Sequence, residues 1–361
     1  MSDVLVVTWD GGGAVAPALG TAGELRDRGH RVRVLGHPSM RVTVEARGLE
    51  FHPYRRARPW RPEARPGTRR AELTFLATCL DRGVGRDVAA LLREHPCDVT
   101  IVDCMLLAAF AAVRRAGVPH VALVHTFYGY MRNEFGAGTL NTIATLKGLR
   151  PGRLWDRADR ALVTTLPSLE PLSPLPANAR VVGPVVPPAV PARSTGGVLV
   201  SLSSLHYPGQ VATLQSVVDA VADLPVPVVV TTGSAVRPGE IRAAFPVEVR
   251  GYVPHAEIMP TVSLVVGHGG HGTTMQALAH DLPMVILPAF DRSDQRLVGS
   301  VLQRAGAAEV VSRKAGSAVI RSAIDRMLAP GPHRGAAARL GAEIRSSAGA
   351  HTAADEVEAL L

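Results

Sequence analysis

The chain of 361 residues is long enough for two domains of ordinary size. Its 47% of hydrophobic and 19% of charged residues exclude a disordered chain and predict substantial cores. The net charge of +8 favours anionic substrates, but no helix-turn-helix, zinc-finger or aromatic RNA-binding pattern accompanies it, so we expect no nucleic-acid partner.

The first half of the chain alternates strands with helices. Residues 4–7 predict a buried strand, followed by a glycine loop, a helix over 17–28 and a second strand over 31–35. This order is typical of a parallel α/β sheet. The same half then predicts a strand at 99–102 leading to Asp103, a helix at 106–116, a strand at 121–124 and a last strand at 162–165. We place an N-terminal domain over residues 1–182.

Two insertions interrupt this alternation. Residues 52–70 are rich in Arg and Pro and predict a loop, and residues 127–152 predict a second, longer one. Long loops in compact domains are often binding elements. The second loop carries the aromatic residues Phe127, Tyr128, Tyr130 and Phe135. We therefore expect it to cover an apolar ligand.

The second half begins after a stretch at 183–197 that is rich in Pro and small residues, which predicts an interdomain linker. Strands are then predicted at 198–202, 226–231, 247–249, 264–266 and 284–287. We place a second domain over 198–340 and a terminal helix over 341–361 that could return to the N-terminal domain. The predicted fold is α/β, with two Rossmann-like α/β/α domains facing each other across a cleft that binds ligands at the strand ends.

The expected location of the protein follows from its cysteines and apolar runs. Cys79, Cys97 and Cys104 are odd in number and are not spaced like a metal site, and the residues before the first strand do not form a secretory signal. The longest apolar run, 105–113, is too short to span a bilayer. We therefore expect a cytoplasmic protein without a membrane span.

The most specific motif is the glycine-rich turn at 267–274, which follows the strand at 264–266 and opens into a helix. Such a turn exposes backbone N–H groups at a helix N-terminus, where the helix dipole favours anions. His268 could add a ring N–H, and Thr273 could add a hydroxyl. The motif predicts a cradle for a phosphorylated ligand, a nucleotide above all.

The motif and its surroundings resemble those of the GT-B fold nucleotide-sugar glycosyltransferases, in the bacterial antibiotic and macrolide branch akin to the UDP-glycosyltransferases. The matching segments are Gly267–Thr274 with Gln276-Ala277-Leu278, Asp281-Leu282-Pro283, Leu287-Pro288, Asp294-Gln295 and Gly251–His255. The order and spacing of these segments are specific, and the resemblance covers nearly the whole chain. It implies that residues 1–182 form an acceptor-binding domain and that residues 198–340 form a nucleotide-sugar-binding domain.

The resemblance implies a donor site. His268 would contact a phosphate of the donor, and Gly270, Gly272 and Thr273 would bind its diphosphate. Ser204 would lie near the phosphates, and Val253 would contact the nucleobase, with Tyr252 beside it. Asp294 and Gln295 would bind hydroxyls of the donor sugar. The donor residues carried over are Ser204, Tyr252, Val253, His268, Gly270, Gly272, Thr273, Gln276, Asp294 and Gln295.

Three positions in this region depart from the family's pattern. Gly267 replaces the family's first histidine, and Val298 replaces an asparagine. Gln276 stands where an acidic residue usually holds the ribose hydroxyls. The segment before Asp294 is also longer than usual, so that Asp291 could substitute for Asp294.

The catalytic base is not where the family would place it. An inverting transfer uses a base near the acceptor hydroxyl, but the usual position is occupied by Ala14. Our candidates are, in order, Asp10, Asp103 and His125, which follow predicted strands; Asp103 matches the family's acidic partner. Asp10 could instead stabilise a turn, and Asp103 could cap a helix. No Asp-x-Asp motif is present, so we expect no metal.

The sequence thus predicts an inverting, metal-independent glycosyltransferase. It would use no cofactor and would move a (deoxy)sugar from a nucleoside diphosphate, dTDP or else UDP, to an apolar natural-product aglycone; a homodimer is one option for its assembly. A non-catalytic nucleotide-binding partner is an alternative, because the base is missing. A NAD- or FAD-dependent oxidoreductase is another, because Gly267-x-Gly269-x-x-Gly272 matches the dinucleotide fingerprint. A sugar epimerase of the same fold is a third.

Overall fold

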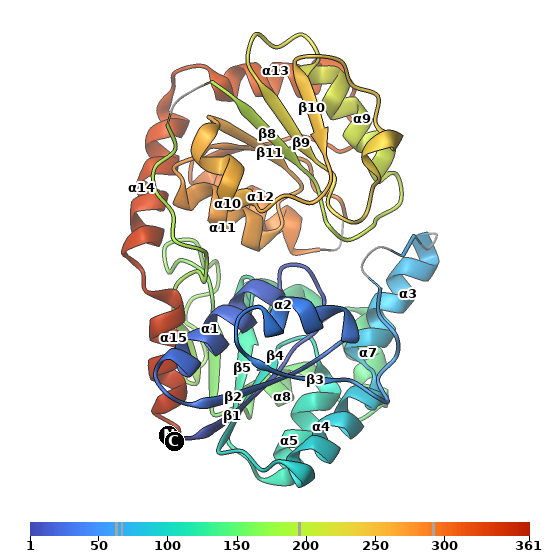
Figure 1. The fold of residues 1–361 in the computed structure, drawn as a ribbon, viewed down its shortest axis with the longest axis vertical. Helices are drawn as coiled ribbons and strands as arrows, with labels where there is room; N and C mark the ends of the chain where they lie inside the picture. Colours follow the sequence, from blue (N-terminus) through green and yellow to red (C-terminus); the bar gives the residue numbers. More distant parts are fainter. Residues whose placement is uncertain (62–63, 66–67, 194–195, 291–292) are drawn as a thin grey trace. The chain divides into compact units, whose positions relative to one another are not determined.

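A computed structural model describes residues 1–61, 64–65, 68–193, 196–290 and 293–361. The chain forms two compact units. Unit 1 comprises Met1–Arg61, Arg69–Val185 and Ala348–Leu361, and unit 2 comprises Val186–Ser347 with a short piece around Arg65. Figure 1 shows both units, each with its own sheet. The predicted α/β class with two parallel sheets is confirmed.

Unit 1 is built on a parallel sheet that has seven strands in the described part of the chain, in the order β3-β2-β1-β4-β5-β6-β7. The strands are β1 (Asp3–Val7), β2 (Arg31–Gly36), β3 (Glu50–Pro53), β4 (Val99–Asp103), β5 (His120–Val124), β6 (Arg160–Val163) and β7 (Ala179–Val181). Strands β1, β4 and β5 are buried along almost their whole length, as expected for central strands covered on both faces. Their carboxyl ends share one edge of the sheet, because all the pairs are parallel.

The helices of unit 1 flank this sheet. They are α1 (Val15–Asp27), α2 (Arg41–Glu45), α3 (Thr68–Cys79), α4 (Arg82–Glu94), α5 (Leu107–Ala116), α6 (Tyr128–Tyr130), α7 (Thr139–Leu146), α8 (Pro151–Asp156) and α15 (Gly349–Glu358), with short helical turns η1 (Pro38–Met40) and η2 (Met131–Phe135). Helix α5 ends at Gly117, whose positive φ of 71° suits a residue without a side chain.

Two edge strands of unit 1 were not predicted. The sequence pattern ends this half with a strand at 162–165, but β7 follows β6, and β3 lies at the opposite edge. Both are short and partly exposed, and β3 ends in Pro53. An edge strand pairs on one side only, so it tolerates a proline without a backbone N–H and does not require a long apolar run. Its sequence therefore gives little signal.

The two insertions also differ from the prediction. Residues 127–152 are helical for most of their length rather than a loop, and Phe127, Tyr128, Tyr130 and Phe135 are buried within unit 1. These aromatic side chains are packed inside unit 1. In the other insertion, β3 takes up residues 50–53 and α3 begins at Thr68.

The last helix, α15, packs against α1 in unit 1 (Figure 1, red beside blue). Its apolar residues Ala353, Ala354 and Val357 join the core beneath the sheet. Arg28, just after α1, forms ion pairs with Asp355 at 2.7 Å and Glu358 at 2.6 Å. The end of the chain therefore belongs physically to unit 1.

Unit 2 repeats the architecture with a parallel sheet that has six strands in the described residues, ordered β10-β9-β8-β11-β12-β13. The strands are β8 (Val198–Ser201), β9 (Val228–Thr231), β10 (Val247–Arg250), β11 (Leu264–Gly267), β12 (Met284–Ile286) and β13 (Ala308–Val310). The helices are α9 (Gln210–Val221), α10 (His255–Ile258), α11 (His271–Ala279), α12 (Asp294–Arg304), α13 (Ser317–Leu328) and α14 (Pro332–Ser346), with turns η3 (Pro238–Glu240) and η4 (Met259–Thr261). Of these strands, only β13 is absent from the sequence prediction.

Among the described residues, no helix combines the length and the apolar character needed to cross a bilayer.

Candidate functional site

The three candidate bases lie at the carboxyl edge of the unit 1 sheet. Asp10 follows β1, Asp103 ends β4 and His125 follows β5, and these three strands are neighbours in the sheet. The order β1-β4-β5 thus brings together side chains that the sequence separates widely. By contrast, Ala14 precedes α1 as a fully buried residue, so this position offers no proton acceptor.

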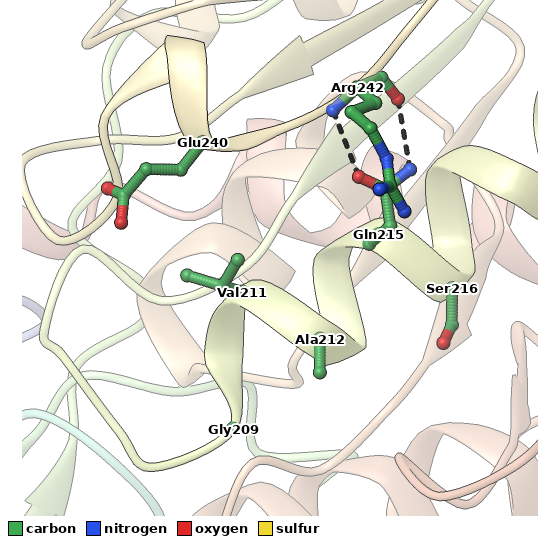
Figure 2. A pocket seen from close by; sticks show the side chains of 7 residues that line it. All are labelled: Gly209, Val211, Ala212, Gln215, Ser216, Glu240 and Arg242. Atoms are coloured by element: carbon green, nitrogen blue, oxygen red, sulfur yellow. Dashed lines mark hydrogen bonds between the residues drawn. The ribbon is translucent and has the colours of Figure 1, made fainter.

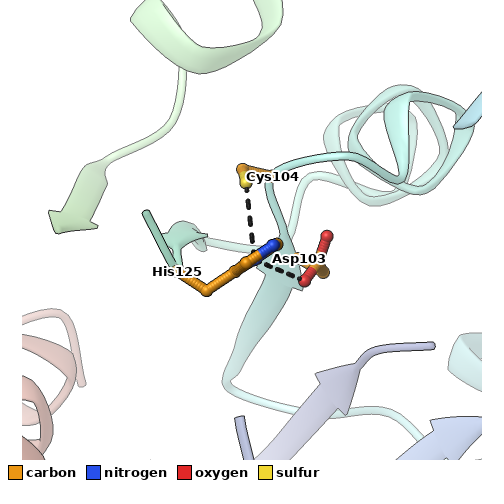
Figure 3. Close-up of side chains that lie close together, drawn as sticks. All are labelled: Asp103, Cys104 and His125. Carbon is orange, nitrogen blue, oxygen red and sulfur yellow. Dashed lines mark hydrogen bonds and ion pairs between the residues drawn. The ribbon is translucent and has the colours of Figure 1, made fainter. Parts of the chain in front are cut away.

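His125 and Asp103 form a buried pair (Figure 3). Nδ1 of His125 lies 3.1 Å from Oδ2 of Asp103, and the two side chains are 9% and 0% exposed. The second carboxylate oxygen of Asp103 accepts a hydrogen bond of 2.9 Å from the backbone N–H of Met105. Because Nδ1 faces Asp103, Nε2 on the other side of the ring is turned away from the carboxylate and is free to meet a substrate.

The carboxylate also sets the charge of the ring. Burial lowers the pKa of His125, but the Asp103 carboxylate outweighs burial and raises this pKa well above the ordinary value. A histidine held in this way is a stronger base once its proton has left. The His125–Asp103 pair therefore has the arrangement of a general base with an orienting carboxylate.

Cys104 lies beside this pair. Its Sγ is 3.8 Å from Nδ1 of His125, and burial raises the pKa of the thiol. Donor atoms of Asp103, Cys104 and His125 all lie within 4.8 Å of one another, a spacing that could also accommodate a metal ion. Since one Asp103 oxygen already holds the Met105 N–H and the other faces the imidazole, we interpret the group as a proton-handling pair.

Asp10 has a different environment. Its Oδ2 accepts a hydrogen bond of 2.7 Å from the hydroxyl of Ser39, and its backbone carbonyl accepts one of 2.6 Å from the indole of Trp60. The residue is half-buried, in the loop after β1. Asp10 therefore remains near the candidate base pair as an acidic side chain with a hydroxyl partner.

In unit 2 the glycine-rich turn that the sequence predicts to bind phosphate lies at the end of β11. The turn at 267–270 joins β11 to α11, whose N-cap residue, Gly270, provides no side-chain hydrogen bond. The N-terminal N–H groups of α11 therefore lack a side-chain cap, as an anion-binding helix end requires. Gly269 has a φ of +81°, and a Cβ there would lie 2.8 Å from the Ile286 side chain. A Cβ on Gly272 would meet nothing within 4 Å.

His268 lies in this turn as a neutral ring. Its Nδ1 is buried and has no hydrogen-bond partner among the described residues. Burial, with a smaller contribution from the nearby His255, lowers the pKa of His268 to about 4. A neutral imidazole with an unsatisfied nitrogen is suited to hydrogen-bond an incoming oxygen. This orphan nitrogen is the clearest sign of a ligand in unit 2.

A hydrogen bond that the sequence did not predict connects β8 to the segment that is expected to meet the nucleobase of the donor. Ser201, the last residue of β8, and His255, the first of α10, lie 2.9 Å apart between Oγ and Nε2. Since β8 is the neighbour of β11, this hydrogen bond holds the segment with Tyr252 and Val253 near the turn. Tyr252 itself is 77% exposed. The only sequence signal was the position of His255 at the end of the matching segment.

Two predicted sugar-binding residues begin helix α12, after β12. Oε1 of Gln295 accepts hydrogen bonds from the backbone N–H groups of Ala289 at 2.7 Å and Phe290 at 3.3 Å, so this amide oxygen holds the loop. Asp294 is the first residue of the helix. The substitute considered for it, Asp291, lies outside the described residues.

The remaining predicted donor residues stand at the same edge. Ser204 follows β8 with an exposed side chain, and its carbonyl accepts a hydrogen bond of 3.2 Å from Ser234. Thr273 and Gln276 lie half-buried on α11, in its first and second turns. Because β8, β11 and β12 are adjacent, Ser204, the turn and Gln295 follow neighbouring strands.

One open cavity of about 640 Å³ lies elsewhere in unit 2, beside α9 and η3 (Figure 2). It is lined by Gly209, Val211, Ala212, Gln215, Ser216, Glu240 and Arg242. The amide of Gln215 exchanges two hydrogen bonds of 2.9 Å with the backbone of Arg242, so these polar groups already have partners. None of the predicted site residues lines this cavity.

Comparisons with known proteins agree with this geometry. The family described as erythromycin biosynthesis protein CIII-like, C-terminal domain, matches residues 215–360. The 4'-demethylrebeccamycin synthase of Lentzea aerocolonigenes is 28% identical, and the match covers 99% of each chain. The calicheamicin glycosyltransferase CalG4 superposes with a TM-score of 0.80 at 24% identity, over 100% of this chain and 98% of that one. Glycosyltransferase VinC in complex with dTDP superposes with a TM-score of 0.74 at 21% identity, over 99% of each chain.

The family match contains β11, the turn and α11, and the solved structures match both units in fold. The chain is a glycosyltransferase with the GT-B fold, and its residues 215–360 match the family of the erythromycin biosynthesis protein CIII-like C-terminal domain.

Proposed function

We propose that the protein is an inverting glycosyltransferase that moves a deoxysugar from dTDP to a natural-product aglycone without a metal ion. The donor class is supported by VinC, which binds dTDP, and the acceptor class by the relative named 4'-demethylrebeccamycin synthase. Within this proposal, residues 1–182 bind the acceptor, residues 198–340 bind the donor, and 183–197 join them.

The observation that carries the donor half of the proposal is the uncapped N-terminus of α11 beside the orphan Nδ1 of His268. The backbone N–H groups and a neutral imidazole can both donate to the diphosphate as negative charge develops on it. Gly272 leaves the room that a phosphate needs.

In the acceptor half, His125 acts as the base. Its Nε2 removes the proton of the acceptor nucleophile while that atom attacks the anomeric carbon, the bond from that carbon to the phosphate oxygen breaks, and dTDP leaves with the electron pair. Asp103 orients the ring and stabilises the imidazolium that forms. Such base catalysis is worth roughly 10²–10⁴-fold in rate. Asp10, the first sequence candidate, is the alternative base.

Thermal unfolding with dTDP, UDP, GDP, ADP and NAD at matched concentrations tests the donor assignment. A ligand present at 100 times its Kd stabilises the protein by about 2.7 kcal/mol, which is readily detected. We expect dTDP to stabilise most, and His268→Ala to weaken its binding roughly 10-fold by removing one hydrogen bond to a charged group. Stabilisation by NAD alone, or by no nucleotide, would refute the donor assignment.

Transfer itself is tested by following dTDP release from a dTDP-deoxysugar with and without an acceptor. Nucleotide binding in the absence of any release would favour the non-catalytic alternative, for which Ala14 at the usual position of the base is the specific argument.

A further inference from the structure

Aromatic side chains are scarce in this protein, at 4% of residues, but five of them form one connected series. Trp9 contacts Trp60 with 5.0 Å between ring centroids and Phe75 with 5.9 Å. Phe75 continues to Phe135 at 6.4 Å, and Phe135 to Trp155 at 6.2 Å. We call these residues the ring cluster. It contains all three tryptophans of the chain.

The ring cluster is attached to both loops that carry candidate catalytic residues. The indole N–H of Trp60 donates to the carbonyl of Asp10 at 2.6 Å, and that of Trp155 donates to the carbonyl of Cys104 at 2.9 Å. Cys104 directly follows Asp103 of the base pair. The ring cluster is therefore anchored to the backbone at Asp10 and at Cys104, next to the Asp103–His125 pair.

Two features distinguish the ring cluster from an ordinary apolar core. Trp60 and Phe75 are only half-buried, whereas Trp9, Phe135 and Trp155 are buried. Trp9 is 2% exposed, and its indole N–H has no hydrogen-bond partner among the described residues. Buried tryptophans normally pair this N–H, as Trp155 does here.

The close packing around Trp9 is built into the loop. A Cβ on Gly11 would lie 2.3 Å from Cε2 of the Trp9 ring, so glycine at this position is what lets the indole fold over the backbone. The loop after β1 thus holds the Trp9 ring against its own backbone, beside Asp10. A fixed ring with an unpaired donor is a preorganised recognition element.

We infer that the ring cluster selects an acceptor with a planar aromatic ring system, and that the indole N–H of Trp9 donates a hydrogen bond to an oxygen of that acceptor. The inference rests on the proposed function and narrows its acceptor class. Aromatic rings attract one another in offset or edge-to-face arrangements, which a saturated acceptor cannot match. An oxygen substituent on the acceptor would satisfy the orphan donor.

Tryptophan fluorescence gives a direct test, because every tryptophan belongs to the ring cluster. We would titrate the protein with alizarin, a planar dihydroxy aromatic, and with androstanediol, a saturated tetracyclic diol, and measure the affinity of each by calorimetry as well. We expect alizarin to bind with a change in fluorescence and androstanediol to bind much more weakly. Equal affinity for the two probes would overturn the inference.

Three variants sharpen this test. Phe75→Leu removes a half-buried ring and should weaken alizarin roughly 2- to 10-fold, raising KM for aromatic acceptors more than it lowers kcat. Trp9→Phe keeps a ring but removes the N–H, and should weaken alizarin roughly 10-fold. Phe245→Leu, which alters an exposed ring of unit 2, should change neither. If Phe75→Leu weakens both probes alike, the rings only support the fold and the inference is wrong.

The outcome is separable from that of the proposed function. Stabilisation by dTDP together with transfer to saturated acceptors only would reject the aromatic acceptor and keep the glycosyltransferase. Alizarin binding without any nucleotide binding would instead remove the donor assignment, and with it the basis of the inference.

Discussion

Each unit places a histidine at the carboxyl edge of a parallel sheet, but the two rings are shifted in opposite directions. In unit 1, the Asp103 carboxylate raises the pKa of His125 above its ordinary value, against the effect of burial. In unit 2, burial and the neighbouring His255 lower the pKa of His268 to about 4. The same residue type is thus prepared to exchange a proton in one unit and to remain a neutral hydrogen-bonding group in the other.

The same parallel α/β architecture thus presents different chemical groups at the carboxyl edges of its two sheets. The unit 1 edge is built from side chains: an ion pair, a thiol and a series of rings. The unit 2 edge is built mainly from backbone, with glycines that give access to the N-terminus of α11. The following changes probe this contrast, from the largest expected effect to the smallest.

Removing the base should have the largest effect. His125→Gln should lower kcat roughly 10²- to 10⁴-fold while leaving dTDP affinity unchanged, because the donor site lies in unit 2. Steady-state kinetics and nucleotide titration measure the two quantities. His120→Gln, which alters another buried histidine of the same strand region, should keep most of the activity. Wild-type kcat in His125→Gln, with loss of activity in Asp10→Asn, would move the base to Asp10.

The pH dependence should reveal the partner of the base. Only neutral His125 can accept a proton, so kcat/KM should rise as the pH passes through its raised pKa. Asp103→Asn should shift this rising limb to lower pH and lower the maximal rate, because the carboxylate no longer favours the imidazolium. A rising limb that stays in place in Asp103→Asn would show that another group titrates.

The contribution of the His125–Asp103 pair to the free energy of unfolding should fall as the pH rises, whereas kcat/KM rises. Since the folded state holds the His125 proton more tightly, the pair stabilises the fold fully below the unfolded pKa of about 6.5. This contribution is lost as the pH rises through the folded pKa. Chemical denaturation at several pH values should show the loss in the wild type and its absence in Asp103→Asn.

A smaller effect on ligand binding is expected in unit 2, where the proposed donor site is formed mainly by backbone groups of the glycine-rich turn. Gly272→Ala should weaken dTDP binding several-fold, because the added Cβ occupies space that the diphosphate would approach. Its effect on stability should be neutral or favourable by up to about 1 kcal/mol, since alanine favours helix more than glycine. Gly23→Ala, also in a helix with nothing within 4 Å of the added Cβ, is the matched control and should leave binding unchanged. Unchanged dTDP affinity in Gly272→Ala would place the diphosphate elsewhere.

The smallest effect should come from a contact outside both sites. Arg28→Ala removes ion pairs that join α1 to α15 and should lower the free energy of unfolding by about 1 kcal/mol, with kcat unchanged. Arg41→Ala, which loses one exposed pair with Glu45 and the contact of its guanidinium with the Phe51 ring, is the comparison and should also leave kcat unchanged. A large loss of activity in Arg28→Ala would mean that the position of α15 matters for the unit 1 site.

The sequence by itself determined the parallel α/β class, most central strands and the glycine-rich turn between β11 and α11. These features are local: buried strands are short apolar runs, and a turn made from backbone needs its glycines side by side at 267–272, where they can be read directly. The edge strands β3 and β7 escaped prediction because a strand paired on one side needs few apolar residues.

Only the tertiary structure decided the unit 1 site. The order β1-β4-β5 brings His125 to Asp103 across 22 positions of sequence, and the ring cluster joins Trp9 to Trp155. The hydrogen bond between Ser201 and His255 likewise depends on the tertiary structure. His255 begins α10, which leads to β11, and β11 is the neighbour of β8 in the sheet. A local sequence pattern cannot predict such pairs. Parallel strands are joined by long crossover connections, so the sequence does not show which strands become neighbours in the sheet.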